Sequence, residues 1–111
     1  MAIYFETSKP GALHAAFDLA IDDGSITTWE YDKDGDYTHK ALNWAKNMWL
    51  RPIEEAGKLS FYTLPRKDKK IDRTNFAYYH GHLIETFINH FSDKFSVASA
   101  TPSPAGKDKI E

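Results

Sequence analysis

The chain contains no cysteine. It therefore has no disulfide framework, no thiolate zinc site and no cysteine nucleophile, which fits a reducing compartment. The sequence also lacks an apolar run of the roughly 18 residues that a membrane-spanning helix needs. Its first residues lack the basic and apolar regions of a secretory signal. These absences predict a cytoplasmic protein without a membrane partner.

Motifs that carry catalytic chemistry are missing too. The sequence contains no nucleophile elbow, no phosphate-binding glycine loop and no dinucleotide-binding fingerprint. His80 and His82 would point about 200° apart on a helix, so they cannot share a metal ion there. We therefore expect no catalytic residue, no metal site and no cofactor. A small hydrolase-type enzyme would need surface histidines such as His39, His82 or His90 gathered in one pocket.

What the sequence does contain is typical of one globular domain. Its 111 residues are 41% hydrophobic and 14% aromatic, so a large apolar core is available. The charges are unevenly distributed. Residues 1–57 hold five Lys or Arg against ten Asp or Glu, a net charge of −5, whereas residues 58–111 hold nine against six, a net charge of +3. The first half is acidic and the second half is basic.

The longest segment with a single hydrophobic period runs over residues 74–95. Its apolar residues recur at helical spacing, which predicts a core helix. His80 falls within the apolar face and is expected to be a buried histidine hydrogen-bonded to a strand or loop. Gly81 costs about 1 kcal/mol relative to alanine inside a helix, so we expect it to allow the close approach of another element. A second helix is predicted over residues 10–23.

Segments rich in β-branched and aromatic residues predict the strands. They are residues 3–5 as an edge strand, 25–31, 37–40, 47–51 before Pro52, and 58–64, which forms a hairpin with 47–51. We predict an α+β fold, a two-layer sandwich in which an antiparallel sheet of three to four strands packs against two helices on one face. Residues 1–95 form the single domain. Residues 96–111, which are small and polar, form a flexible tail.

The acidic segment at residues 32–36, Asp-Lys-Asp-Gly-Asp, is the first candidate site. Its alternating aspartates match the start of an EF-hand calcium loop. Tyr37, His39 and Asn43, however, stand where that loop needs glycine, an aliphatic residue and glutamate. An Asp-Gly hairpin turn explains the segment without a metal ion.

The same segment belongs to an acidic surface that could meet a basic protein partner. We expect this surface to include aromatic residues that the core does not need. The candidate partner-binding residues are Trp44, Trp49, Asp32, Asp34 and Asp36. Our leading hypothesis is a small non-catalytic interaction or regulatory module that binds another protein.

A cluster of basic residues before the predicted helix at residues 74–95 supports an alternative function. Its members are Arg66, Lys67, Lys69, Lys70 and Arg73. The free N–H groups and the dipole of a helix N-terminus favour anions at the same place. The alternative is therefore nucleic-acid binding through backbone phosphates rather than bases. The sequence also leaves a homodimer open.

Overall fold

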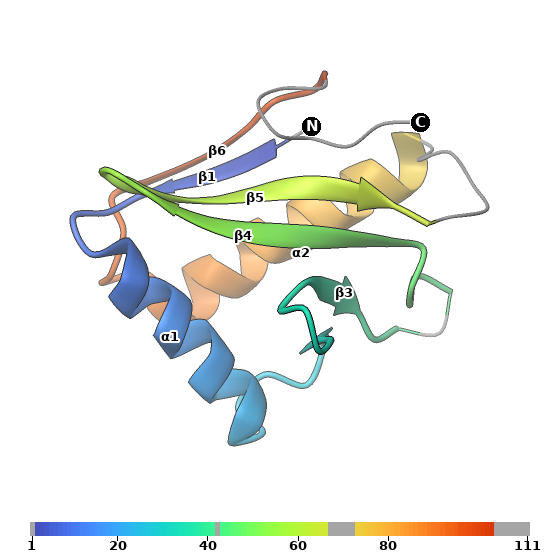
Figure 1. The fold of residues 1–111 in the computed structure, drawn as a ribbon, viewed down its shortest axis with the longest axis horizontal. Helices are drawn as coiled ribbons and strands as arrows, with labels where there is room; N and C mark the ends of the chain where they lie inside the picture. Colours follow the sequence, from blue (N-terminus) through green and yellow to red (C-terminus); the bar gives the residue numbers. More distant parts are fainter. Residues whose placement is uncertain (1, 42, 67–72, 104–111) are drawn as a thin grey trace.

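The computed structural model describes residues 2–41, 43–66 and 73–103. They form an α+β fold with a six-stranded antiparallel sheet and two helices (Figure 1). In chain order the elements are β1 (Ala2–Glu6), α1 (Pro10–Asp22), β2 (Trp29–Tyr31), β3 (Tyr37–His39), β4 (Met48–Glu55), β5 (Lys58–Pro65), α2 (Arg73–Phe91) and β6 (Val97–Ala100). The predicted fold class is confirmed, but the prediction of three to four strands is wrong.

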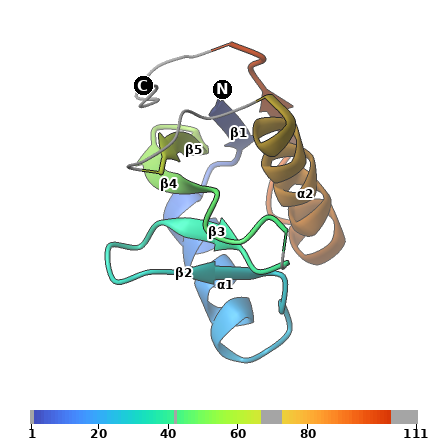
Figure 2. The same ribbon diagram turned by 90° about the vertical axis from the view of Figure 1, so that its right-hand side faces the viewer.

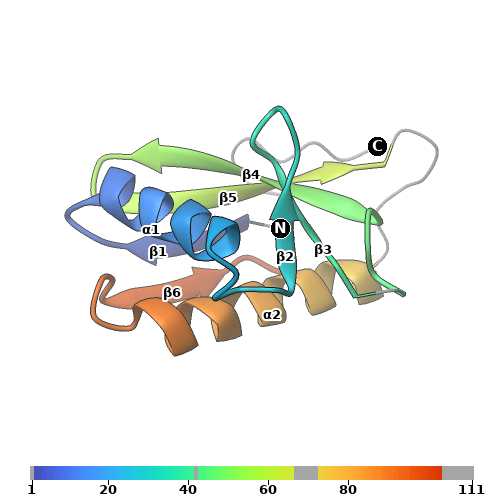
Figure 3. The ribbon, with the colours of Figure 1, turned by 90° about the horizontal axis from the view of Figure 1, so that it is seen from below.

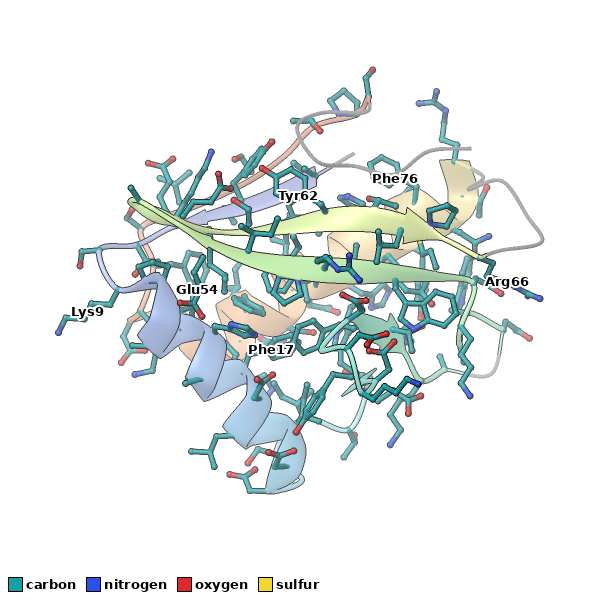
Figure 4. The ribbon with its side chains drawn as sticks, viewed as in Figure 1. Lys9, Phe17, Glu54, Tyr62, Arg66 and Phe76 are labelled. Carbon is teal, nitrogen blue, oxygen red and sulfur yellow. The ribbon has the colours of Figure 1, made fainter. Side chains whose placement is uncertain are left out.

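The strands lie in the order β2-β3-β4-β5-β1-β6, and both helices lie on the same side of β1, β4, β5 and β6 (Figure 1). The core between the layers is largely aromatic. Phe5 of β1 stacks on Phe87 of α2 with ring centroids 4.2 Å apart. Phe17, which lies between α1 and the sheet (Figure 4), meets the Phe87 ring edge-on at 4.9 Å. All three side chains are fully buried, so these rings join both helices to the sheet.

β2 and β3 form a short ribbon at one end of the sheet, beside the helix layer (Figure 2). Two hydroxyl contacts tie this ribbon to the helices. The Trp29 indole N–H donates to Thr86 Oγ1 of α2 at 3.0 Å, and the Tyr37 hydroxyl donates to Asp18 of α1. The strand predicted over residues 25–31 is confirmed only for its last part. The Ile26 N–H bonds to the Ala20 carbonyl of α1 instead of a strand.

The hairpin of β4 and β5 is the longest pairing in the sheet, as the sequence predicted. Trp49 lies opposite Leu64, and Arg51 lies opposite Tyr62. The prediction that Pro52 ends the first strand is wrong, because β4 continues to Glu55. Among the described residues β3 bridges β4 only at Leu50. The missing N–H of Pro52 therefore removes no hydrogen bond to β3.

β1 lies inside the sheet rather than at its edge. β5 pairs with one side of β1 and β6 pairs with the other, so that Tyr4 lies opposite both Ser60 and Ser99. The expectation of a tail without structure from residue 96 onward is therefore wrong for β6. Its Val-Ala-Ser-Ala sequence has little strand signal, and its partner lies at the other end of the chain. Residues 104–111 of the expected tail lie outside the described residues.

α2 confirms the predicted core helix, although it ends at Phe91. His80 is 5% exposed, as expected, and its Nδ1 lies 2.7 Å from the Phe76 carbonyl oxygen of its own helix. Among the described residues, a Cβ at Gly81 would meet nothing within 4 Å outside the helix, so none of them makes the close approach that we expected. In the described parts of the chain no helix has the length and apolar character needed to cross a membrane.

Candidate protein-binding site

The candidate site is built around the turn between β2 and β3, residues 32–36, here called the aspartate turn. Asp32 shapes this turn, because its Oδ1 accepts the backbone N–H groups of Asp34 at 2.9 Å and of Asp36 at 3.0 Å. Gly35 follows with a φ of +83°, a conformation that glycine adopts at no steric cost. The side chain that opens the turn therefore also holds it in one conformation.

Asp36 and Arg51 fix the aspartate turn to β4. The Arg51 Nε donates to Asp36 Oδ1 at 2.9 Å, and the Arg51 Nη2 donates to Asp36 Oδ2 at 2.8 Å. The Asp36 side chain is only 6% exposed, whereas the Arg51 side chain is 46% exposed. The hydrogen bond to Asp36 raises the pKa of Arg51. Asp36, which we expected on the partner-binding surface, therefore serves as a buried counter-ion.

The remaining acidic groups of the turn are available to a partner. Carboxylate oxygens of Asp32, Asp34 and Asp36 lie within 4.8 Å of one another. Both oxygens of Asp36 are bound to Arg51, and one oxygen of Asp32 is bound to the backbone. Asp32 and Asp34 are nevertheless exposed. The turn thus presents two fixed surface carboxylates rather than a complete set of metal ligands.

A groove of about 320 Å³ lies on one side of the aspartate turn. We call it the Trp49 groove. It is lined by Asp32, Asp36, Trp49, Leu64, Pro65 and Arg66. Trp49 and Leu64 are cross-strand neighbours, and Trp49 is half-buried, so one face of the groove is apolar. The structure therefore brings together two predicted residues, Trp49 and Asp32, that are far apart in the sequence.

A second groove of about 390 Å³ lies beside the same turn, and we call it the Tyr31 groove. Its walls come from α1, β2 and β4 as well as from the turn. The residues that matter here are His14, Asp18, Tyr31, Asp34, Arg51 and Pro52. Tyr31 is 38% exposed, and its hydroxyl donates to Asp22. The sequence indicated neither His14 nor Tyr31 as part of a site.

His14 connects α1 to the sheet beneath the Tyr31 groove. Its Nδ1 lies 2.9 Å from Glu54 Oε2, and its Nε2 lies 3.7 Å from Asp18 Oδ2. Figure 4 shows Glu54 on the α1 side of β4.

Asp18 also connects this network to Tyr37, because it accepts the hydrogen bond of the Tyr37 hydroxyl. Burial and this hydrogen bond raise the pKa of Tyr37, so its phenol stays protonated. The spacing of His14 and Asp18 was the only sequence signal for this network.

Trp44 lies in a different environment from Trp49. Its ring stacks on Tyr78 of α2, with centroids 3.9 Å apart, and is partly buried against the core. The Tyr79 hydroxyl also donates to the Trp44 carbonyl oxygen. Trp44 does not line the Trp49 groove or the Tyr31 groove. We therefore assign Trp44 a packing role, in contrast to its expected place on the partner-binding surface.

Two of the three histidines considered for an enzyme are neighbours. The rings of His39 and His82 lie 5.5 Å apart, and His82 Nδ1 lies 3.4 Å from Glu85. His39 is 3% exposed, and its Nδ1 accepts the Ala41 N–H at 3.0 Å, so its proton resides on Nε2. His90 is two helical turns beyond His82, about 12 Å along α2. The arrangement gathers only part of the set that the hydrolase hypothesis requires.

His39 predicts a pH dependence of stability. Burial, and to a lesser extent the nearby His82, lowers the pKa of His39 in the folded protein. In the unfolded chain the His39 pKa returns to about 6.5. Above that pH the group has no effect on stability, and below it the unfolded state binds the proton more readily. The free energy of unfolding should therefore fall with decreasing pH, by at most about 1.4 kcal/mol per pH unit for this group.

Urea unfolding between pH 7.5 and pH 5 checks this prediction. His39→Asn keeps a hydrogen-bond acceptor near the Nδ1 position and removes the titration. Its loss of stability on acidification should be smaller than that of the wild type. His90→Asn, which removes an exposed histidine, serves as the control and should behave like the wild type. Equal losses for the wild type and His39→Asn would contradict the assignment.

The basic cluster is only partly described. Arg66 lines the Trp49 groove, and Arg73 is the exposed first residue of α2. Lys67, Lys69 and Lys70 lie outside the described residues. Nucleic-acid binding through this cluster therefore stays a prediction.

Comparisons with protein-family models, with curated proteins and with solved structures found no match for this chain.

Proposed function

We propose that the protein is a small cytoplasmic interaction module that binds a basic segment of another protein and catalyses no reaction. The observation that supports this proposal most directly is the position of the aspartate turn. It stands between the Trp49 groove and the Tyr31 groove, and Asp32 lines both of them. A rigid acidic turn with an aromatic side chain in the groove on each side suits a partner that carries several cationic side chains.

Lysine and arginine match the Trp49 groove in two ways. Their methylene stems can cover Trp49, Leu64 and Pro65, while their cationic heads reach the carboxylate of Asp32. A cation over an indole ring is also stabilised by the ring electrons. In the Tyr31 groove the ring of Tyr31 and the carboxylates of Asp18 and Asp34 offer the same combination. Both grooves therefore favour the same class of side chain.

The distribution of charge supports a basic partner over a longer range. Residues 1–57, which contribute the aspartate turn, half of the residues that line the Trp49 groove and all of those that line the Tyr31 groove, carry a net charge of −5. A surface of one sign steers an oppositely charged partner and speeds its association. This net charge of −5 already includes the positive charge of Arg51, which is paired with Asp36.

Binding of a fluorescent Arg-Gly repeat peptide tests this proposal. In the double variant Asp32→Asn/Asp34→Asn, the side-chain amide oxygen at position 32 can still accept the hydrogen bonds that shape the turn. The dissociation constant should nevertheless rise at least about tenfold, because both exposed negative charges of the turn are lost. Binding should also weaken with added salt.

Two controls complete the test. Glu85→Gln/Asp93→Asn removes the same charge from exposed positions on and after α2 and should leave binding unchanged. A Glu-Gly repeat peptide should not bind. Equal affinity for the two peptides, or equal losses in the two double variants, would show that the aspartate turn is not the binding site.

A further inference from the structure

Among the described residues, β6 is an edge strand of the sheet, at the opposite side from the aspartate turn. The Thr101 N–H donates to the Ala2 carbonyl at 2.9 Å, which fixes the alternation of hydrogen bonds between β6 and β1. The N–H and C=O groups of Ala98 and Ala100 therefore point away from β1. Val97–Ala100 contains no charged residue and no proline, the usual protections of an edge strand.

α2 carries an apolar flank next to this edge, of which only Ile84 is packed against the core formed by the described residues. Tyr78, His82 and Thr86 contact Trp44, His39 and Trp29, so that flank of α2 faces β2 and β3. The opposite flank faces the β6 side, where α2 runs along β6 (Figure 3). This flank consists of Ala77, Gly81, Ile84 and Ile88, which follow one another at helical spacing.

The flank is accessible and has room for a ligand. Ile88 is 53% exposed, Ala77 and Gly81 are exposed, and Ile84 is half-buried. A Cβ at Gly81 would meet none of the described residues within 4 Å outside the helix. Glycine weakens a helix, and nothing in the described fold requires it here. Close approach of a ligand to the helix backbone at this position explains why residue 81 is a glycine.

We infer that β6 and this flank of α2 bind an extended segment of another protein as a seventh strand. The backbone of the segment pairs with the free N–H and C=O groups of Ala98 and Ala100. Alternate side chains of an added strand point to the helix side of the sheet, where they cover Ala77, Gly81, Ile84 and Ile88. The ligand is therefore an extended segment with apolar residues at alternate positions. This surface is separate from the aspartate turn, and its ligand has a different chemistry.

A second copy of the chain does not fit this edge. Seen from the helix side, α2 lies beside β6 on the side away from β1 (Figure 3), so in a two-fold pairing each copy would place its helix close to the paired strands. The paired β6 strands would be about 4.8 Å apart, whereas packed helices need about 8–10 Å between their axes. The two α2 helices would collide. A single added strand has no helix layer, which selects a peptide segment over a homodimer at this edge.

Fluorescence polarisation with labelled heptapeptides tests the inference on the full chain. In each probe peptide, Ser alternates with Val, Leu or Phe. One control has the same composition, but its Ser residues and its apolar residues stand in two separate blocks. A second control is N-methylated, so its backbone cannot donate hydrogen bonds. The alternating peptides should bind and both matched sets should not. Hydrogen exchange of the Ala98 and Ala100 amides should slow when an alternating peptide is added.

Variants locate the binding surface. Ala100→Pro removes an outward N–H and none of the bonds to β1, and Ile88→Lys places a charge on the flank. Each should raise the dissociation constant at least about tenfold. Leu19→Lys makes the same apolar-to-charged change at a residue of α1 that is 64% exposed and should have no effect. If Ala100→Pro does not fold, Ile88→Lys still decides the question.

Three results of the binding experiments would overturn the inference. These are the absence of binding by every alternating peptide, binding that does not depend on residue order, and binding that survives both Ala100→Pro and Ile88→Lys. Self-association that Ala100→Pro abolishes would also overturn it, because the edge would then belong to a second copy. Asp32→Asn/Asp34→Asn should leave heptapeptide binding unchanged, so failure of this inference is distinguishable from failure of the proposed function.

Discussion

Replacing Phe87 with alanine should lower the free energy of unfolding by about 3–5 kcal/mol. Phe87 is fully buried where α1, α2 and the sheet meet. Its ring stacks on Phe5 at 4.2 Å and meets Phe17 at 4.9 Å and Phe61 at 5.7 Å. Alanine would leave a cavity among rings that belong to three different elements, and these cannot all collapse toward it. The loss is large because a domain of this kind has only about 5–15 kcal/mol in total.

Urea unfolding followed by circular dichroism measures this effect. Ile88→Ala is the matched control, because it truncates the next residue of the same helix at a side chain that is 53% exposed. It should change stability by no more than about 0.5 kcal/mol in the absence of a ligand. Similar losses for the two variants would mean that the aromatic cluster around Phe87 is not the centre of the core.

Replacing Arg51 with methionine should cost about 2–3 kcal/mol, because it leaves the charge of Asp36 buried without its partner. Both Asp36 oxygens accept hydrogen bonds from Arg51, and the carboxylate is only 6% exposed. The loss falls below that of a fully buried pair, because Arg51 is 46% exposed and water can approach Asp36 from that side. The methionine keeps most of the apolar stem, so the change in packing is small.

A double-mutant cycle separates the ion pair from packing. Asp36→Asn/Arg51→Met has no buried charge and should recover at least half of the loss of the single variant. A stability of Arg51→Met within about 0.5 kcal/mol of the wild type would show that the pair contributes nothing.

Arg51→Met also distinguishes two possible effects of Arg51 on peptide binding at the aspartate turn, through net charge or through the position of the turn. Removing a positive charge next to a binding site for cations should strengthen binding if only net charge matters. If Arg51 instead holds the turn in position, Arg-Gly peptide binding should weaken in Arg51→Met. We expect the weaker binding, because Asp36 connects the turn to β4 through this contact.

Much of the local structure could be predicted from the sequence. α1, α2 and the β4–β5 hairpin each lie within one continuous segment, and their hydrophobic period or turn residues specify them without reference to the rest of the chain. The burial of His80 follows from the same period. Pro52 was misread because a proline is compatible with a strand that has no neighbour on one side at that position.

The candidate site could be predicted only in part. The Asp-Gly turn is a local signal, and the alternation of β4 separates Trp49 from the core residues beside it. The pairing of Asp36 with Arg51 and of His14 with Glu54 joins different elements, so no spacing in the sequence indicates either contact. Trp44 and Trp49 looked equivalent because their difference depends on whether Tyr78 is close enough to stack on the ring.

By itself, the sequence determined the two helices, the central hairpin, the acidic turn and the unequal charge of the two halves. Those features depend on neighbouring residues and on backbone preferences. Tertiary structure alone decided that β1 is an inner strand, that β6 is an edge strand, and that none of the described residues outside α2 approaches Gly81. Strand order results from backbone hydrogen bonds between distant segments, such as the bond that the Thr101 N–H donates to the Ala2 carbonyl, between residues 99 positions apart. A local pattern carries no information about which distant segment will supply the partner.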